Sequence, residues 1–256
     1  MKHRLILLAA FIFNCYTLFA QNVRFTSSGI IEFEKTINKH AAFKKALEGS
    51  DGMLDNLFDS YKKSTPQFKV VKSTLKFSAG KTLFTPVAAE TDGSMMSFDG
   101  MGPDQPNIVY TNLDAHTFTT EKIVFDETFL LKDNTRKINW KLTSEMRTIA
   151  GYECRRANAI IMDSVYVVAF YTDKIPVSGG PESFTGLPGM ILGIAMPHDN
   201  VTWFAKTVTD RPIPESEIKP PVKGKPTDHK GLLETINKLL GKWGGNGNRL
   251  IKPLLL

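Results

Sequence analysis

The fold is decided by Phe170-Tyr171-Thr172-Asp173-Lys174-Ile175-Pro176, followed by Gly180-Pro181 and then by Gly186-Leu187-Pro188-Gly189-Met190-Ile191-Leu192. Two apolar runs are joined here by a loop that is rich in proline and glycine. Proline fixes its own φ and pushes the preceding residue toward extended backbone, whereas glycine reaches conformations that other residues avoid. We therefore expect a rigid loop that ends one buried strand and aims the next.

Within this loop, Pro188-Gly189 suits the two central positions of a type II turn. Leu187 precedes a proline and should be extended, and Ile191 and Leu192 then enter the sheet. Two interpretations are open. The turn could serve only to aim a buried strand, or it could be a preshaped surface for a ligand or partner, since a fixed loop loses less entropy on binding.

Outward from the loop, an apolar period of two predicts many short strands. The segment 165–171 is apolar on both faces, so we expect a central strand that is covered on both sides. The predicted strands are 29–34, 68–77, 82–85, 108–112, 117–124, 127–132, 139–142, 147–149, 152–162, 165–171, 190–196 and 201–208.

Helical periodicity appears near the two ends of the chain, over 36–48, 53–61 and 228–243. Many successive strands with helices at the ends predict an α+β, mainly β, fold. We expect an antiparallel curved sheet, like half of a barrel, with N-terminal and C-terminal helices packed on it. A sandwich is the alternative arrangement.

The chain divides by composition into five parts. These are a signal peptide 1–20, a β-rich domain with N-terminal helices 21–210, a Pro/Lys-rich linker 211–227, a C-terminal amphipathic helix 228–243 and a tail 244–256. Lys2 and Arg4 precede an apolar run that is too short to cross a bilayer. No later apolar run is long enough either, so we expect an exported protein without a membrane span after cleavage.

Charge and cysteine content limit the partners. The formal charge of +6 loses the contributions of Lys2 and Arg4 on cleavage, which leaves +4. The basic excess is not interleaved with aromatic residues, so no nucleic-acid interface is predicted. Cleavage also leaves Cys154 without a second cysteine, and we interpret it as a buried thiol; its neighbours Arg155 and Arg156 keep a reactive thiol open.

Known catalytic patterns do not occur in this sequence. Ser183 lacks the flanking glycines of a nucleophile elbow, and there is neither a His-Glu-x-x-His helix nor a Cys-x-x-Cys pair. We therefore predict no catalytic residue, no metal and no cofactor. His198 and Asp199 lie in an expected hairpin turn, where a polar turn pair is the favoured interpretation.

The run Gly186-Leu187-Pro188-Gly189-Met190-Ile191 resembles the motif of the GLPGLI family. Family members are exported proteins of Gram-negative bacteria whose function is not established. Phe170 stands where the family often has tryptophan, and Met190 replaces the usual leucine. The resemblance covers about residues 138 to 194 and implies a periplasmic or secreted location. Its further matching residues are Trp140, Ile149-Ala150-Gly151-Tyr152, Cys154, Ala157, Tyr171-Thr172, Ile175-Pro176, Gly180-Pro181 and Phe184.

Our leading hypothesis is a non-catalytic binding or accessory module of the cell envelope that holds an apolar ligand or a partner segment. Two alternatives remain: an envelope enzyme that uses Cys154 or the pair His198 and Asp199, and a purely structural envelope protein. The residues expected to contact a ligand or partner are Trp140, Tyr152, Tyr171, Phe184, Gly186, Leu187, Pro188 and Gly189.

Overall fold

The computed structural model describes residues 25–47, 55–87, 105–124, 127–240 and 248–255. The expected signal peptide, residues 53–54 of the second predicted helix and residues 241–243 of the last one lie outside these ranges. The helices are α2 (Lys39–Leu47), α3 (Asp55–Ser64), α4 (His229–Leu240) and α5 (Asn248–Leu255), and two 3-10 turns are η3 (Pro197–Asp199) and η4 (Glu215–Glu217).

Twelve strands of the described chain form one sheet, in the order β12-β6-β5-β4-β3-β2-β1-β11-β10-β9-β8-β7. Neighbouring strands are antiparallel except β12 and β6, which are parallel. The strands are β1 (Gly29–Asn38), β2 (Phe68–Ser78), β3 (Lys81–Pro86), β4 (Ile108–Asn112), β5 (Thr117–Val124), β6 (Glu127–Asn134), β7 (Lys141–Ile149), β8 (Tyr152–Ile161), β9 (Val165–Thr172), β10 (Met190–Met196), β11 (Val201–Asp210) and β12 (Lys225–Thr227).

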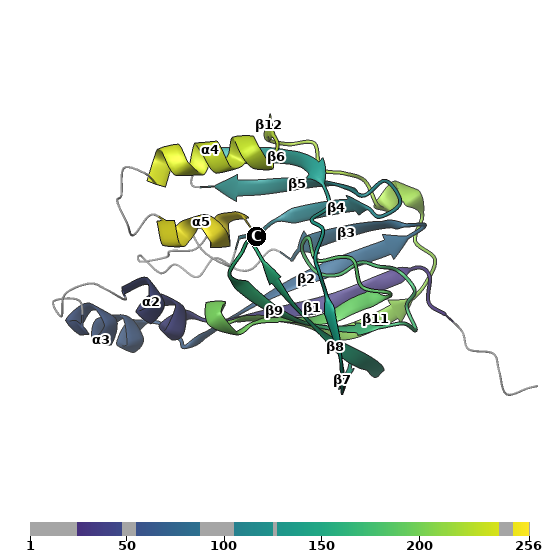
Figure 1. The fold of residues 1–256 in the computed structure, drawn as a ribbon, viewed down its shortest axis with the longest axis horizontal. Helices are drawn as coiled ribbons and strands as arrows, with labels where there is room; N and C mark the ends of the chain where they lie inside the picture. The colour runs from purple at the N-terminus through teal and green to yellow at the C-terminus, as the bar shows by residue number, and fades with distance from the viewer. Residues whose placement is uncertain (1–24, 48–54, 88–104, 125–126, 241–247, 256) are drawn as a thin grey trace, which may run out of the picture.

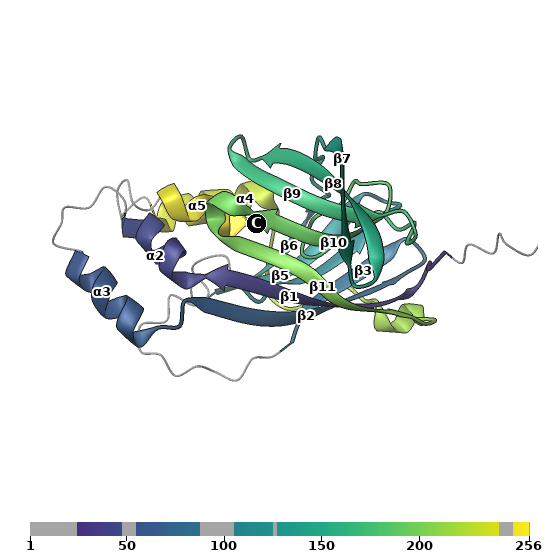
Figure 2. The same ribbon diagram turned by 90° about the horizontal axis from the view of Figure 1, so that it is seen from below.

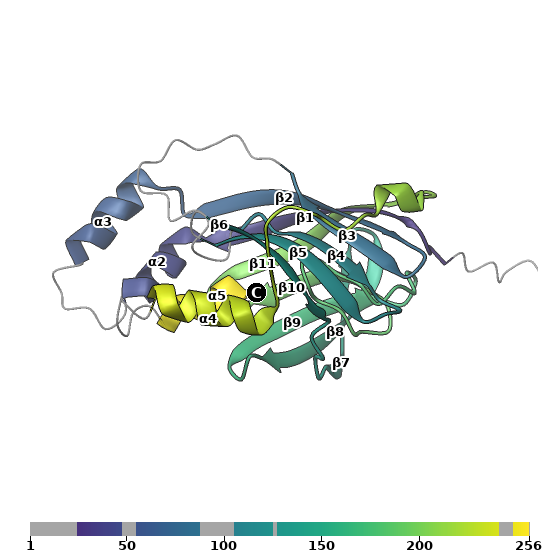
Figure 3. The same ribbon diagram turned by 90° about the horizontal axis from the view of Figure 1, so that it is seen from above.

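The sheet is strongly curved, as expected from the sequence (Figure 1). We call its inner side, on which α4 and α5 lie, the concave face (Figure 3). Strands β8 and β9 curve round toward this side, so that Lys252 of α5 donates a hydrogen bond to Ser164 in the β8–β9 turn. The helices α2 and α3 extend beyond the ends of β1 and β2 (Figure 2). The prediction of a mainly β fold with a curved sheet is confirmed.

Two apolar clusters support the concave face. The main core joins β1, β2, β9, β10 and β11, with Phe33, Leu75 and Ile194 at most 1% exposed. Strand β9 is buried on both faces from Val167 to Thr172, as predicted. The second cluster, which we call the helix core, consists of Phe118, Val124, Phe129, Leu131, Leu232, Ile236, Leu240 and Leu254.

The first helix begins later than the sequence indicated. Residues 36–38 were expected to be helical but continue β1, where Thr36 pairs with Val70 of β2 and Thr202 of β11. Strands β2 and β11 lie on either side of β1 and supply hydrogen-bond partners for its backbone, so these residues extend the strand instead of starting the helix. The helix then starts beyond Asn38, whose Oδ1 accepts a hydrogen bond from the N–H of Ala41 at 3.0 Å.

The C-terminal region also contains more regular structure than predicted. The expected linker 211–227 holds η4 and β12, and β12 pairs with β6 through Lys225 opposite Phe129. The expected tail contains α5. Within the described residues, no helix has the length and apolar content needed to span a membrane.

Candidate functional site

The proline-rich loop between β9 and β10 is a series of very tight turns. The N–H of Gly189 donates to the carbonyl of Leu187 at 2.8 Å, which makes Pro188 the centre of a three-residue γ-turn. The predicted type II turn is therefore wrong. Gly189 has φ +153°, far from the roughly +80° that a type II turn requires, and the N–H of Met190 donates to the carbonyl of Ile175 at 2.9 Å instead of to Leu187.

This loop is fixed along the start of β10. The N–H of Ile191 donates to the carbonyl of Gly179 at 2.8 Å. Gly189 has φ +153°, and a Cβ at this position would lie 2.1 Å from the carbonyl oxygen of Thr172. Earlier in the loop, Glu182 adopts φ +53° and is buried. The loop thereby delivers a carboxylate to the interior.

Glu182 belongs to a buried polar cluster on the concave face, which we call the lysine cluster: Lys35, Asn107, Lys122 and Glu182. Lys35 Nζ lies 3.4 Å from Glu182 Oε1, and Asn107 Nδ2 donates to Glu182 Oε2 at 3.1 Å. Lys122 Nζ donates to Asn107 Oδ1 at 3.3 Å. Each of the four residues is at most 7% exposed. A loop and two strands thus place two ammonium groups around one carboxylate.

Aromatic rings connect the lysine cluster to the loop. Lys35 Nζ lies 4.5 Å from the centre of the Trp203 ring, a distance suited to a cation–π contact. Phe184 packs edge-on against Trp203 with ring centroids 6.3 Å apart. The loop therefore contributes both a charged residue and a buried ring to the same region.

The charges of this region are unbalanced. Among the described residues, Lys35, Lys122 and Glu182 are the buried charged side chains, and the half-buried Arg136 adds a third cation. Burial lowers the pKa of Lys122 to about 8, while Glu182 opposes this shift and Lys35 and Arg136 add to it. Burial also lowers the pKa of Arg136.

A small cavity lies beside Lys122 and Arg136. The volume of this cavity is about 20 Å³, which suffices for about one or two water molecules. Residues that can form hydrogen bonds line one part of it, and apolar residues line another. The polar ones are Thr111, Thr120, Lys122, Thr135, Arg136, Ser183 and His229, and the apolar ones are Val109, Phe118, Leu131 and Leu255.

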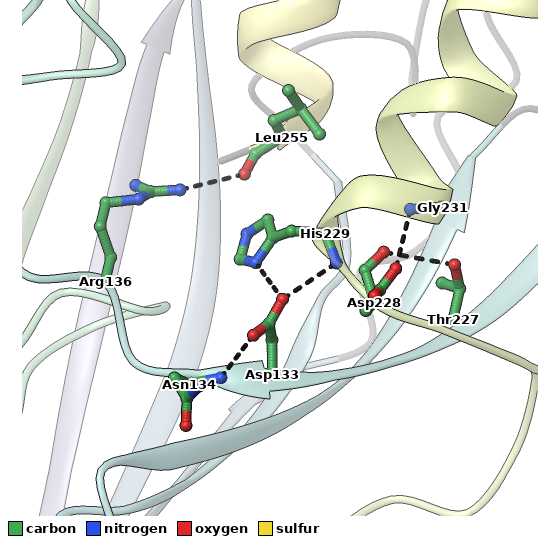
Figure 4. A network of polar contacts seen from close by, with 8 residues as sticks. All are labelled: Asp133, Asn134, Arg136, Thr227, Asp228, His229, Gly231 and Leu255. Atoms are coloured by element: carbon green, nitrogen blue, oxygen red, sulfur yellow. Dashed lines mark hydrogen bonds and ion pairs between the residues drawn. The ribbon is translucent and has the colours of Figure 1, made fainter.

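The start of α4 is anchored beside this cavity (Figure 4). Asp133 Oδ2 accepts a hydrogen bond from the N–H of His229 at 3.1 Å and lies 3.3 Å from Nδ1 of the same residue. Asp228 Oδ1 accepts from the N–H of Gly231 at 2.8 Å, as an N-cap residue does. Partial burial raises the pKa of Asp133, but hydrogen bonds from Asn134 and His229 outweigh it and leave this pKa below its ordinary value.

The end of α5 covers the cavity. Arg136 Nη2 donates to the carbonyl oxygen of Leu255 at 3.3 Å (Figure 4). Leu254 is fully buried in the helix core. Among the residues that the structure describes, no three His, Cys, Asp or Glu side chains converge in a way that could hold a metal ion.

Several residues expected from the sequence to form a site gather around the loop. Trp140 Nε1 donates to the carbonyl of Thr185 at 2.9 Å, and its ring lies beside Gly186. Phe184 and Leu187 are 2% exposed, whereas Pro188 is exposed. A direct contact of these residues with a ligand stays a prediction.

The remaining expected site residues lie in strands β8 and β9 and at the end of the loop. Tyr171 is buried in β9, and Tyr152 of β8 packs half-buried against the main core. Gly189 is buried in the loop, directly before β10. The buried Tyr171 and the half-buried Tyr152 thus belong to the packing of the main core.

The two alternatives for a catalytic group lie in different elements, β8 and η3. Cys154 is completely buried in β8, and burial raises the pKa of its thiol to about 12, which disfavours the reactive thiolate. His198 and Asp199 lie in η3, where Asp199 pairs with Lys45 at 2.9 Å. The His198 ring lies edge-on to Tyr166 with centroids 6.4 Å apart.

Sequence reasoning missed the lysine cluster, although part of its signal was present. Lys35 has the inward parity of Phe33 and Ile37, and Lys122 shares its side of β5 with Thr120 and Val124. A lysine at the buried parity of a strand is unusual unless it is paired. Asn107 and Glu182 lie outside the strands, where no periodicity could have indicated their burial.

A family model described as "Protein of unknown function (Porph_ging)" matches residues 160–193. This segment contains β9, the proline-rich loop and the start of β10. The match supports a relation to proteins of unknown function over this part of the chain, and it does not confirm the GLPGLI family name. No curated protein sequence matches the chain.

Two solved structures of PNGF-II are similar to this fold. The structure in space group P21 has a TM-score of 0.50 at 14% identity and covers 83% of this chain and 33% of PNGF-II. The structure in space group C2 has a TM-score of 0.51 at 14% identity, with 81% and 32% covered. This chain thus corresponds to about a third of PNGF-II, and the similarity concerns the fold alone.

Proposed function

We propose that this chain is a non-catalytic binding module that holds an apolar ligand or a partner segment on the concave face of its sheet. The observation that carries the proposal is that the short helix α5 packs against the concave face. This eight-residue helix is connected to the body by Leu254 in the helix core, by the Arg136 bond to the Leu255 carbonyl and by Lys252. The concave face therefore accepts an apolar side chain from a short amphipathic segment.

The unbalanced charge supports the same function. Burying a cation without a partner is costly, and catalytic and binding sites are where such arrangements concentrate. Arg136 is bonded to a backbone carbonyl and Lys122 to a neutral amide. Apolar residues at these two positions would stabilise the fold at least as well, so the buried cations favour a binding role over a purely structural one.

Native mass spectrometry of the full chain, purified without denaturation from its natural source, tests the proposal. We expect a protein species that carries an additional non-covalent mass, which disappears after unfolding and refolding. Crosslinking before cell disruption would detect a partner protein that is lost during purification. The absence of both a bound molecule and a crosslinked partner would contradict a binding function and favour the structural alternative.

We also propose that the protein acts after export into the periplasm or the medium of a Gram-negative bacterium. The basic and apolar start of residues 1–20 and the resemblance to exported proteins support this location. N-terminal sequencing of the protein from fractionated cells tests it. We expect a start near Gln21 in the exported fraction, and an intact Met1 in the cytoplasmic fraction would be inconsistent with export.

A further inference from the structure

We propose that the cavity beside Lys122 and Arg136 is an anion site, and that it takes the carboxylate head of an amphipathic ligand whose apolar chain lies along the helix core. This inference rests on the proposed binding function and adds the chemical class of the ligand. Charge, cavity size and the position of the apolar wall each support it.

The charge argument begins with the partners of the lysine cluster. The two carboxylate oxygens of Glu182 are engaged by Lys35 and by Asn107. Lys122 donates to the amide oxygen of Asn107, and Arg136 donates to the carbonyl oxygen of Leu255. Lys122 and Arg136 thus donate these hydrogen bonds to neutral oxygens, and the Glu182 carboxylate near Lys122 is shared with Lys35, so an incoming anion would supply further negative charge.

The size of the cavity selects the head group. The space of about 20 Å³ matches one or two water molecules. A carboxylate can replace those waters, and the threonines Thr111, Thr120 and Thr135 on the wall can each donate a hydroxyl hydrogen bond. A phosphate monoester is bulkier and more highly charged, so it would have to displace more of the wall.

The apolar side of the same cavity accounts for the chain of the ligand. Phe118 and Leu131 line the cavity and belong to the helix core, where Leu254 is completely buried. Leu255 closes the cavity and its carbonyl oxygen accepts the hydrogen bond from Arg136. A bound carboxylate would replace that carbonyl as the acceptor, and its apolar chain would take the position of the α5 side chains.

The test compares two probes of equal chain length, dodecanoate and dodecan-1-ol, in titration calorimetry with the full chain. We expect dodecanoate to bind at least about tenfold more tightly than the alcohol, since a buried charge-assisted contact exceeds 1.4 kcal/mol. In Lys122→Met the two probes should bind with about equal affinity. Lys132→Met removes the same charge from an exposed position of β6 and should leave the preference unchanged.

Circular dichroism establishes whether each variant is folded. If Lys122→Met does not fold, Arg136→Gln removes the other cation of the cavity and serves as the test variant. Equal binding of the two probes, or a dodecanoate preference that survives both variants, overturns the anion site. Failure of both probes to bind also overturns it. In each of these cases a ligand found by native mass spectrometry would leave the proposed binding function standing.

Discussion

At the scale of single residues, the proline-rich loop depends on backbone positions that only glycine fits. Gly189 lies where a Cβ would be 2.1 Å from the carbonyl oxygen of Thr172. Gly151 also has positive φ, at +82°, but nothing lies within 4 Å of its Cβ position. A side chain at Gly189 would therefore clash with the backbone, whereas a side chain at Gly151 would meet only the strain of a positive φ.

We predict that Gly189→Ala destabilises the fold by about 3 kcal/mol or more, because the backbone oxygen cannot move away without breaking the β9–β10 pairing. Gly151→Ala, the matched control, should cost only about 1 to 2 kcal/mol of left-handed strain. Urea unfolding monitored by fluorescence measures both. Equal costs for the two variants would show that contact with Thr172 is unimportant.

A second residue-scale prediction concerns Cys154. Its thiol is completely buried and its pKa is raised to about 12 by burial, so the thiolate is scarce at neutral pH. We expect no alkylation of the native protein by iodoacetamide at about pH 8, and complete alkylation after unfolding. Intact-mass measurement distinguishes the two states. Rapid labelling of the native protein would revive the thiol enzyme hypothesis.

At the scale of elements, Glu182 connects the β9–β10 loop to β1. The residue that it pairs with, Lys35, lies 147 positions earlier in the chain. Both side chains are less than 9% exposed, so the loop and the strand share one buried charge pair. Loss of one member leaves the other charge buried without compensation.

We predict that Glu182→Gln costs roughly 3 to 5 kcal/mol of unfolding free energy, because Lys35 and Lys122 then face no carboxylate. Glu215→Gln is the control: Glu215 pairs with Lys81 at 3.2 Å but is largely exposed, so we expect a change below about 1 kcal/mol. Adding Lys35→Met to Glu182→Gln should restore part of the loss. Strict additivity in this double-mutant cycle would argue against direct coupling.

The start of α4 gives another prediction at this scale. Asp228→Ala removes the N-cap bond to Gly231 and should cost about 1 kcal/mol. Hydrogen exchange should show the loss as faster exchange in α4, with β9 unaffected. Glu234→Ala, at an exposed position of the same helix, should leave exchange of α4 unchanged. Uniform acceleration throughout the chain would contradict a local cap.

At the scale of the whole molecule, the concave face combines a curved sheet, an unbalanced set of charges and a short covering helix. The sheet brings β1 and β5 to the same interior, so that Lys35 and Lys122 act on one another. Stability of the entire fold should therefore respond to the titration of Lys122.

We predict that the titration of Lys122 raises the free energy of unfolding as the pH rises. Burial lowers its folded-state pKa to about 8, below the ordinary value of about 10.4. Between these values the unfolded chain binds more protons than the folded one, so stability rises with pH. Lys122→Met should be the more stable protein near neutrality, and its advantage should shrink by up to roughly 3 kcal/mol by about pH 10.5.

Urea unfolding of both proteins across this range provides the measurement, since the comparison cancels titration of residues common to both. Glu182, Lys35 and Arg136 are the charged neighbours that influence Lys122. A constant difference between the two proteins would show that Lys122 has the same pKa in the folded and unfolded chains.

Local side-chain patterns were sufficient for much of the sheet. The strands 108–112, 117–124 and 190–196 have the predicted bounds, because a period of two or a short continuous apolar run is a property of each segment by itself. The double burial of β9 followed from its continuous apolar run. The prolines and glycines also indicated a rigid loop, although its turn type depended on the partner that Ile175 offers to Met190.

Tertiary structure alone decided the candidate site and the C-terminal arrangement. Lys35, Asn107, Lys122 and Glu182 meet because the sheet places β1 between β2 and β11 and curves β5 toward the loop, which no local period encodes. The pairing of β12 with β6 and the seating of α5 on the helix core likewise depend on surfaces made by distant segments. Sequence patterns specify which face of an element is buried, whereas the curvature and order of the strands determine what it is buried against.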